Sequence, residues 1–402
     1  MNLKFGLAAL LISSFLASIV QFNFGKTEIT LEKLDTDNGQ YIYYDLYKPK
    51  IASEKNKVPF IAIIPGFQRS KEALSNIAIE LSRRGYVVGL IDPYAQGLSS
   101  SSRSRIAATT QGYGMFALIE HVNESSDFNF INKELLGSTG HSMGGNAAIR
   151  GANYFGKKAD KQNKKSLLHS VYVSGYVLTL RDDVLKDVRS NVGVSYALYD
   201  EGSFRNELKN WDAANMKIAP ESLRTVNSGL KKEEHISEVE LGKYYGDLES
   251  NTLRVIFNEE LLHPFQPYNA EATANQLAYF ETVFGAPIKL DTFDQIWQWK
   301  EFFTLLNMII SFWLLIPLTR TLLKINFFKT LVKPIPEALP VQNRAGKTIF
   351  WSVFFISAGI ACVTFIPLVE VAKTLFPEAA TRQLTWFFPQ RMNNSQLCSG
   401  RS

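Results

Sequence analysis

The sequence is poor in cysteine and lacks the common metal-binding spacings. Its 402 residues include only two cysteines, Cys362 and Cys398, and both lie toward the C-terminal end. A disulfide framework is therefore excluded for residues 23–300. Neither a C-x-x-C nor an H-E-x-x-H pattern occurs, so the sequence predicts no metal site and no cofactor.

Charge is also sparse, and the first three quarters of the chain carry almost no net charge. Charged residues make up 20% of the sequence and hydrophobic residues 46%, so long disordered stretches are not expected. Residues 23–300 contain 32 basic and 34 acidic side chains. The net charge of +5 thus arises outside this block, and no nucleic-acid partner is predicted.

Three long runs are nearly free of charge. They cover residues 5–22 ("FGLAALLISSFLASIVQF"), 302–319 ("FFTLLNMIISFWLLIPLT") and 349–369 ("IFWSVFFISAGIACVTFIPLV"). Each is about as long as a helix that crosses a bilayer. We predict transmembrane helices over 300–323 and 348–370. Residues 1–24 are interpreted as an uncleaved signal anchor, with a cleaved signal peptide as the alternative.

The basic residues predict the orientation in the membrane. Between the second and third runs only Glu337 opposes six cations: Arg320, Lys324, Lys329, Lys333, Arg344 and Lys347. Short loops rich in Lys and Arg stay in the cytoplasm. The basic loop at 324–347 is therefore predicted to be cytoplasmic. The sequence predicts a multi-pass protein of the cell membrane whose residues 25–295 are extracytoplasmic, with a tail at 371–402.

Residues 25–295 alternate between apolar strands and amphipathic helices. "VPFIAIIPGF" at 58–67 is typical of a buried strand, "KEALSNIAIELSRRG" of a helix, and "YVVGLIDP" at 86–93 of the next strand. Strand, helix and strand in this order predict a right-handed parallel crossover. The pattern continues and predicts a doubly wound, mostly parallel α/β domain. The polar stretch 203–250 breaks the pattern and is interpreted as a cap-like insertion.

The stretch "STGHSMGGNAA", residues 138–148, contains a G-x-S-x-G pattern centred on Ser142. A serine hydroxyl becomes a nucleophile only with a nearby base, a group that orients the base, and donors for the oxyanion. In this pattern the serine occupies a strained turn between a strand and a helix, and the two glycines let them pack closely. An apolar strand precedes the motif and a small-residue helix follows it. The context therefore favours a nucleophile over a serine in an ordinary glycine-rich turn.

Three segments together resemble the α/β-hydrolase family. They are "GHSMGG" at 140–145, "IPGF" at 64–67 and "IDPYAQGLSS" at 91–100, and they are most similar to the esterase, cutinase and dienelactone-hydrolase-like branches. The resemblance covers roughly residues 40–290 and implies the α/β-hydrolase fold. It also implies an acid and a histidine base that follow the serine in that chain order.

The resemblance assigns the base and acid by their places after the last strands. His263, in "NEELLHPFQP", follows the final apolar strand, whereas His235 stands among lysines and glutamates that are typical of a solvated surface. Asp200, in "VSYALYDEGS", follows the preceding strand. The competing acids are Glu201, which is adjacent, and Asp182 and Asp183, which follow an earlier strand.

The resemblance also implies an oxyanion hole made of two backbone N–H groups. One belongs to Met143, directly after the serine, and the other to Phe67, after the first strand; Phe67 as a core aromatic is the alternative. We predict a membrane-anchored serine hydrolase with Ser142, His263 and Asp200 as its triad. Its substrate would be a small-molecule or lipid-like acyl compound with an ester or related bond. The alternatives are a peptidase or acyltransferase with the same triad, or an inactive hydrolase fold that serves as a membrane module.

Overall fold

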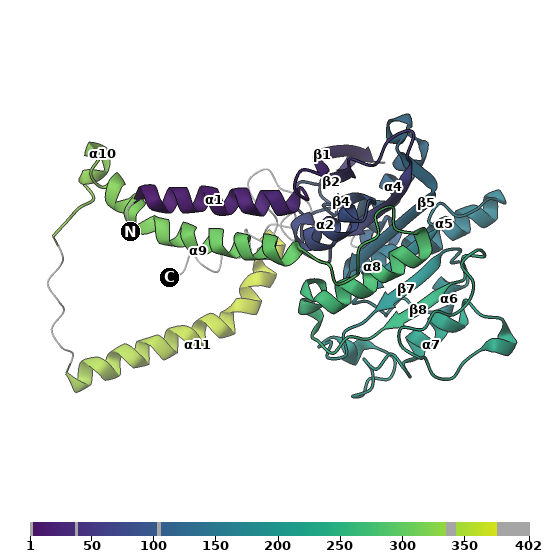
Figure 1. The fold of residues 1–402 in the computed structure, drawn as a ribbon. Coiled ribbons are helices and arrows are strands. Elements are labelled where there is room, and N and C mark those ends of the chain that lie inside the picture. Colours follow the sequence, from purple (N-terminus) through teal and green to yellow (C-terminus); the bar gives the residue numbers. More distant parts are fainter. Residues whose placement is uncertain (1–2, 37–38, 103–105, 335–342, 376–402) are drawn as a thin grey trace. The chain divides into compact units, whose positions relative to one another are not determined.

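The structure is a computed structural model that describes residues 3–36, 39–102, 106–334 and 343–375 (Figure 1). The chain forms two compact units. The larger, here called the sheet unit, comprises Ser13–Ser100 and Ser104–Leu305, and the smaller comprises Met1–Ile12, Ser101–Arg103 and Leu306–Ser402. Most of the predicted tail, with Cys398, and part of the basic loop, with Glu337, lie outside the described residues.

An eight-stranded sheet forms the centre of the sheet unit, in the order β1-β2-β4-β3-β5-β6-β7-β8. From β4 to β8 all neighbouring strands are parallel, while β1 pairs with β2 and β2 with β4 in antiparallel fashion. The strands are β1 (Thr27–Thr36), β2 (Gln40–Pro49), β3 (Val58–Ile64), β4 (Val87–Ile91), β5 (Ile131–His141), β6 (Ser170–Ser174), β7 (Asn191–Ser195) and β8 (Arg254–Phe257). This arrangement confirms the predicted doubly wound, mostly parallel α/β-hydrolase fold.

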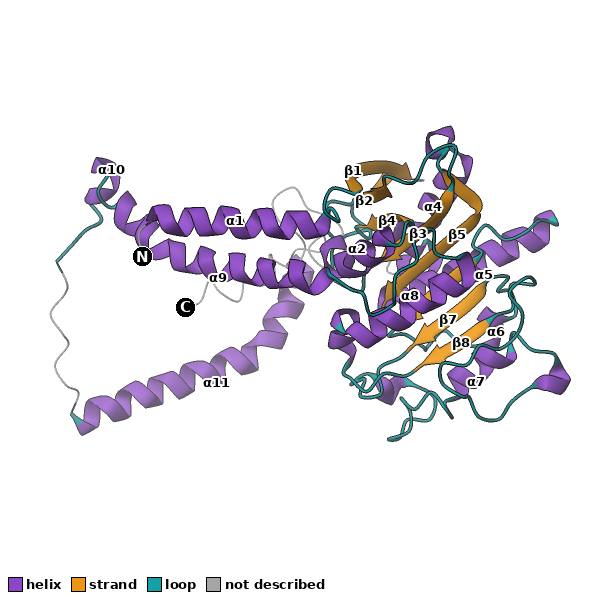
Figure 2. Cartoon of the chain, in the orientation of Figure 1, coloured by secondary structure: helices purple, strands orange, loops and turns teal. Residues whose placement is uncertain are grey.

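Helices cover both faces of the sheet (Figure 2). Because successive strand residues point to opposite faces, β3 contributes Ile61 and Ile63 to one apolar cluster and Phe60, Ala62 and Ile64 to the other. The first cluster includes α2 (Ser75–Arg83) and α8 (Ala270–Phe284). The second includes α4 (Met115–Glu124), α5 (Met143–Gln162), α6 (Asp182–Leu185) and α7 (Pro220–Asn227). Short helices α3 (Ala107–Thr110), η3 (Gly112–Gly114) and η4 (Ser126–Phe128) add to the second cluster, and η2 (Lys71–Leu74) adds to the first.

The antiparallel strands β1 and β2 are a feature that the sequence analysis does not identify. They pair along their full length, from Thr27 opposite Pro49 to Thr36 opposite Gln40. Strand β2 then extends the sheet through the pairing of Tyr44 with Ile91 of β4. The side chains of β1 alternate mainly between half-buried and exposed, as in a strand at the edge of a sheet with one solvated face.

The insertion at 203–250 lies against the β8 end of the sheet. It contains η5 (Ser203–Arg205), α7 and η6 (Lys232–Glu234), and α7 packs on β8. Arg254 of β8 is fully buried, and its Nε donates to Ser228 Oγ over 3.2 Å while its Nη1 donates to Ser190 O over 3.0 Å. Burial lowers the pKa of this guanidinium to about 10. Arg254 thereby connects the insertion to β8 through hydrogen bonds to uncharged oxygens.

Three helices are long and apolar enough to cross a membrane: α1 (Leu3–Gln21), α9 (Trp297–Leu322) and the Arg344–Leu368 part of α11 (Arg344–Leu375). They correspond to the three apolar runs of the sequence. A short α10 (Asn326–Lys329) follows α9. Helices α1 and α9 lie side by side: Ser13 Oγ donates to Phe303 O over 3.1 Å, and a Cβ at Gly6 would lie 2.6 Å from Leu314 Cδ2. Small residues at such contacts let apolar helices pack closely.

Candidate active site

Ser142 occupies a sharp turn between β5 and α5. Its backbone angles, φ 58° and ψ −121°, lie outside the regions that residues other than glycine normally adopt. The turn is held by a hydrogen bond of 2.8 Å from Ser142 N to Ser174 O. A Cβ at Gly144 would lie 1.9 Å from Ile64 O, and one at Gly140 would lie 2.5 Å from the same oxygen. Both positions therefore require glycine, which explains the spacing of the motif.

Two segments of backbone, at Met143 and at Gly66, lie beside the serine. Met143 is the first residue of α5, so its N–H is one of those that a helix leaves without an internal partner, at the positive end of the helix dipole. The β3 end approaches from the other side, since a Cβ at Gly66 would lie 3.8 Å from Ser142 Oγ. Phe67, the residue after Gly66, lines the same pocket as Ser142. The Phe67 side chain is 42% exposed and is not a core aromatic.

His263 and Asp200 lie side by side on the loops that follow β8 and β7. The pairing of these strands continues into the loops: Leu198 N donates to Glu259 O over 2.8 Å, and Tyr199 N to Leu261 O over 3.1 Å. Nδ1 of His263 lies 2.8 Å from Oδ2 of Asp200. A carboxylate only accepts, so this contact places the proton on Nδ1 and leaves Nε2 as the free basic nitrogen.

Asp200 is fixed independently of the histidine. It is buried, and its Oδ1 accepts a hydrogen bond of 2.7 Å from Gly202 N. His263 begins η7 (His263–Tyr268). Asp200 and His263 are therefore each held by the local backbone as well as by their mutual contact, which favours one imidazole orientation.

Ser142 and His263 line the same pocket, which has a volume of about 290 Å³. Phe67, Glu201, Pro264 and Tyr268 also line it. None of its lining residues comes from 203–250. The insertion therefore contributes no wall to this pocket among the described residues.

The competing sequence candidates lie elsewhere or bind other groups. Asp183 is exposed and pairs with Arg181 over 3.0 Å. Asp182 and His235 line a different pocket beside α7. Glu201 reaches the pocket of Ser142, but the carboxylate that contacts the His263 ring is that of Asp200. The structure thus brings together Ser142, His263 and Asp200 from the predicted set, along with the backbones of Met143 and Phe67.

A second histidine, His141, lies against His263. The centres of the His141 and His263 rings are 4.6 Å apart, and His141 Nδ1 lies 3.2 Å from Ser174 Oγ. Burial, followed by the adjacent His263 and by Arg69, holds the pKa of His141 well below its usual value. The ring is therefore neutral and supports His263 without adding a second charge.

A buried carboxylate, Glu259, also supports the histidine loop, and the sequence analysis does not identify it. Ser195 Oγ donates to its two oxygens over 2.9 and 2.8 Å, Gln266 Nε2 donates over 3.1 Å and Asn275 Nδ2 over 2.9 Å. Burial raises the pKa of Glu259. Since Gln266 belongs to η7, this cluster fixes the helix that carries His263. In the sequence Glu259 stands beside Glu260 and no local signal separates them.

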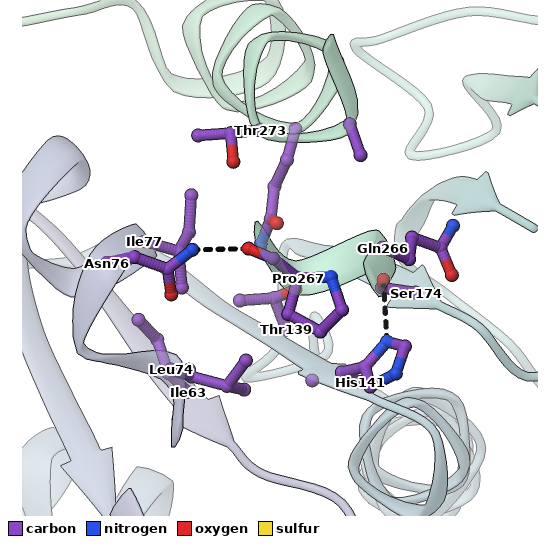
Figure 3. Close-up of a pocket in the computed structure, with 13 residues that line it drawn as sticks. Ile63, Leu74, Asn76, Ile77, Thr139, His141, Ser174, Gln266, Pro267 and Thr273 are labelled. Atoms are coloured by element: carbon purple, nitrogen blue, oxygen red, sulfur yellow. Dashed lines mark hydrogen bonds between the residues drawn. The ribbon is translucent and has the colours of Figure 1, made fainter. Parts of the chain in front are cut away.

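Helix α2 holds the same loop from the other side. Asn76 Nδ2 donates to Pro267 O across a small cavity of about 20 Å³ that also borders His141, Ser174 and Gln266 (Figure 3). Within the described part of the chain, no three His, Cys, Asp or Glu side chains gather in a way that could hold a metal ion.

The strand order, the strained strand–turn–helix at Ser142 and the histidine–aspartate pair define a protein of the α/β-hydrolase fold. Residues 16–202 match the family model described as PETase, PET hydrolase-like. This match includes Ser142 and Asp200, and it supports the predicted resemblance to an esterase-like hydrolase of the α/β fold. No curated protein matches the sequence.

Solved structures of hydrolases match the chain at low sequence identity and with TM-scores below 0.5. An esterase from Pyrococcus furiosus has a TM-score of 0.44 and 11% identity, covering 64% of this chain and 93% of its own. The α/β hydrolase GrgF from a Penicillium species has a TM-score of 0.42 and 14% identity, with 64% and 99% covered. A dienelactone hydrolase from Anabaena variabilis has a TM-score of 0.40 and 13% identity, again with 64% and 99% covered.

The close approach of α5 to β3 predicts a large difference between two glycine substitutions in the same helix. Gly144→Ala places a methyl group against the rigid backbone of Ile64, so we expect the free energy of unfolding to fall by more than about 3 kcal/mol. Gly151→Ala meets side-chain atoms and no backbone, and the nearest is the flexible Met115 Cε at 2.5 Å, so we expect a change within about 1 kcal/mol. Urea unfolding of both detergent-solubilised variants measures this, and equal effects would contradict the account.

The lowered pKa of His141 predicts an acid-sensitive fold. Below about pH 6.5 this histidine binds a proton in the unfolded chain but not in the folded chain. The free energy of unfolding therefore falls as the pH falls. Between pH 7.5 and 5.5 the wild type is expected to lose up to about 1.4 kcal/mol more than His141→Gln. Urea titrations at both pH values give this difference, and a loss of equal size in the two proteins would show that His141 is protonated when folded.

Proposed function

We propose that this protein is a serine hydrolase that cleaves an ester or a related acyl bond. The observation that carries the proposal is the 2.8 Å contact of His263 Nδ1 with the buried Asp200, in a pocket that also contains Ser142 on its strained turn. The contact fixes Nδ1 as the protonated nitrogen and leaves Nε2 as a base for the serine. The resemblance to PET hydrolase-like proteins over residues 16–202 supports the same reaction class.

The proposed reaction has two halves. Ser142 Oγ attacks the ester carbonyl carbon while its proton passes to Nε2 of His263, and the backbone N–H groups of Met143 and Phe67 donate to the oxyanion. The bond to the alcohol oxygen then breaks, and the alcohol leaves with the proton from Nε2. Water, deprotonated by Nε2, attacks the acyl-serine, and the acid is released as Ser142 regains its proton. Asp200 stabilises the imidazolium in both halves.

We further propose that the protein is anchored in the cell membrane, with the sheet unit outside and the basic loop at 324–347 in the cytoplasm. Three helices of sufficient length and apolarity support the anchoring. The six cations between the second and third helices, opposed only by Glu337, support the orientation, because cationic loops are retained in the cytoplasm.

Labelling with a fluorophosphonate tests the nucleophile. The wild type is expected to be labelled covalently and Ser142→Ala to show no labelling, because only an activated serine attacks phosphorus rapidly. Ser70→Ala is the matched control: this serine lies near the pocket but donates to Glu72, so its loss should leave labelling unchanged. Wild-type protein that folds and takes up no label would instead support an inactive hydrolase fold.

The assignment of the acid predicts unequal effects of two Asp→Asn substitutions. Asp200→Asn is expected to lower kcat on a p-nitrophenyl ester by about 10⁴-fold, since the wrong imidazole tautomer then faces the serine. Asp183→Asn should leave kcat unchanged, because this exposed residue pairs only with Arg181. Steady-state kinetics of the two variants decide whether Asp200 or Asp183 is the acid. A large loss in Asp183→Asn with a small one in Asp200→Asn would refute the assignment.

A further inference from the structure

The pocket beside Ser142 and the start of α9 are held by the same short helix, α2. On one side, Asn76 of α2 donates to the carbonyl of Pro267, a residue that lines the pocket. On the other side, Glu80 of α2 accepts hydrogen bonds of 2.7 and 3.0 Å from the backbone N–H groups of Ile296 and Trp297. Helix α2 therefore links the histidine loop directly to the first turn of α9.

The connection at Glu80 is rigid. This carboxylate is completely buried and pairs with Arg83 over 2.7 Å and with Arg84 over 3.0 Å. Arg83 reaches on to Asp294 over 3.0 Å, just before α9. A paired, buried carboxylate that satisfies the free N–H groups at a helix start also meets the positive end of the helix dipole. These contacts hold the first turn of α9 against α2 within the sheet unit.

Two further contacts connect the start of α9 and the histidine loop to the segment around η2 and α2. Lys300 Nζ in the first turn of α9 donates to Ser75 Oγ over 3.0 Å. Tyr268 OH donates to Ala73 O over 3.1 Å, and both Tyr268 and Ala73 line the pocket. The apolar run begins at Phe302, two residues after Lys300, which is about 3 Å of helix rise.

Exposed apolar side chains line the pocket or lie close to His263 in the chain. Phe67 and Tyr268 line the pocket, and Leu262 and Phe265, on either side of His263, are 43% and 61% exposed. The strands β7 and β8 point toward the side of the sheet on which α9 begins (Figure 2). Exposed apolar groups that gather at one place mark a site of interaction, and aromatic rings are favoured at the surface of a bilayer.

We propose that the enzyme takes its substrate from the bilayer that holds α9, and that this substrate is a long-chain acyl ester whose tail stays in the membrane while its carbonyl reaches Ser142. The inference rests on the proposed hydrolase function. The proposal rests on the short stretch of chain between the Lys300 contact and the apolar run that begins at Phe302, which keeps the pocket within reach of the bilayer, and on the exposed apolar side chains of Phe67 and Phe265, which are suited to contact lipid.

Releasing the sheet unit from the membrane surface tests this proposal. A flexible Gly/Ser segment of about twelve residues, inserted between Glu301 and Phe302, leaves the Glu80 and Lys300 contacts in place and adds roughly 20 Å of reach. The matched control carries the same segment after Asn163, in the exposed turn that ends α5. The full-length proteins are reconstituted in phosphatidylcholine–phosphatidylglycerol vesicles. Each is assayed with soluble p-nitrophenyl butyrate and with p-nitrophenyl palmitate dissolved in the bilayer.

The wild type and the control are expected to cleave both esters. The Glu301–Phe302 insertion should keep its rate on the butyrate ester and lose at least roughly tenfold on the palmitate ester, because the mouth no longer stays at the surface. An unchanged palmitate rate in this variant, or a wild type that cleaves only the soluble ester, would overturn the proposal and leave the hydrolase function standing. A wild type that cleaves neither ester contradicts the hydrolase function as well.

Discussion

The site depends on the close approach of α5 to the end of β3. That approach leaves no room for a side chain at Gly140 or Gly144, where a Cβ would lie 2.5 or 1.9 Å from Ile64 O. It forces Ser142 into its strained backbone conformation and turns its side chain out of the sheet. Since the same approach brings Gly66 next to the serine, one packing constraint positions both the proposed nucleophile and the segment that contains Phe67, a proposed oxyanion donor.

The rest of the site is built on strand pairing that continues past the sheet. The loops after β7 and β8 stay in register through Leu198, Tyr199, Glu259 and Leu261, and this register brings Asp200 to His263. Buried polar groups then hold the histidine loop from both sides. Glu259 binds it through Gln266, and α2 binds it through Asn76. Asp200 and His263 are therefore held in place by the surrounding strands and loops and not by their own contact alone.

Much of this could be predicted from the sequence, because the main signals are local. Apolar runs indicated the parallel strands and the three long helices, and the glycine spacing indicated the turn at Ser142. The pair of Asp200 and His263 followed from their places after the last strands. Strands β1 and β2 were missed, because edge strands with one solvated face carry a weak apolar signal. Glu259 was missed because its burial depends on contacts with Ser195 and Asn275, which are distant in sequence.

A crystal structure of the protein after reaction with a fluorophosphonate tests the central claim most directly. The account predicts a covalent bond from Ser142 Oγ to phosphorus, with the phosphonyl oxygen accepting hydrogen bonds from the backbone N–H groups of Met143 and Phe67 and with His263 Nε2 facing the serine oxygen. An adduct on any other residue, or a phosphonyl oxygen directed away from these two N–H groups, would contradict it.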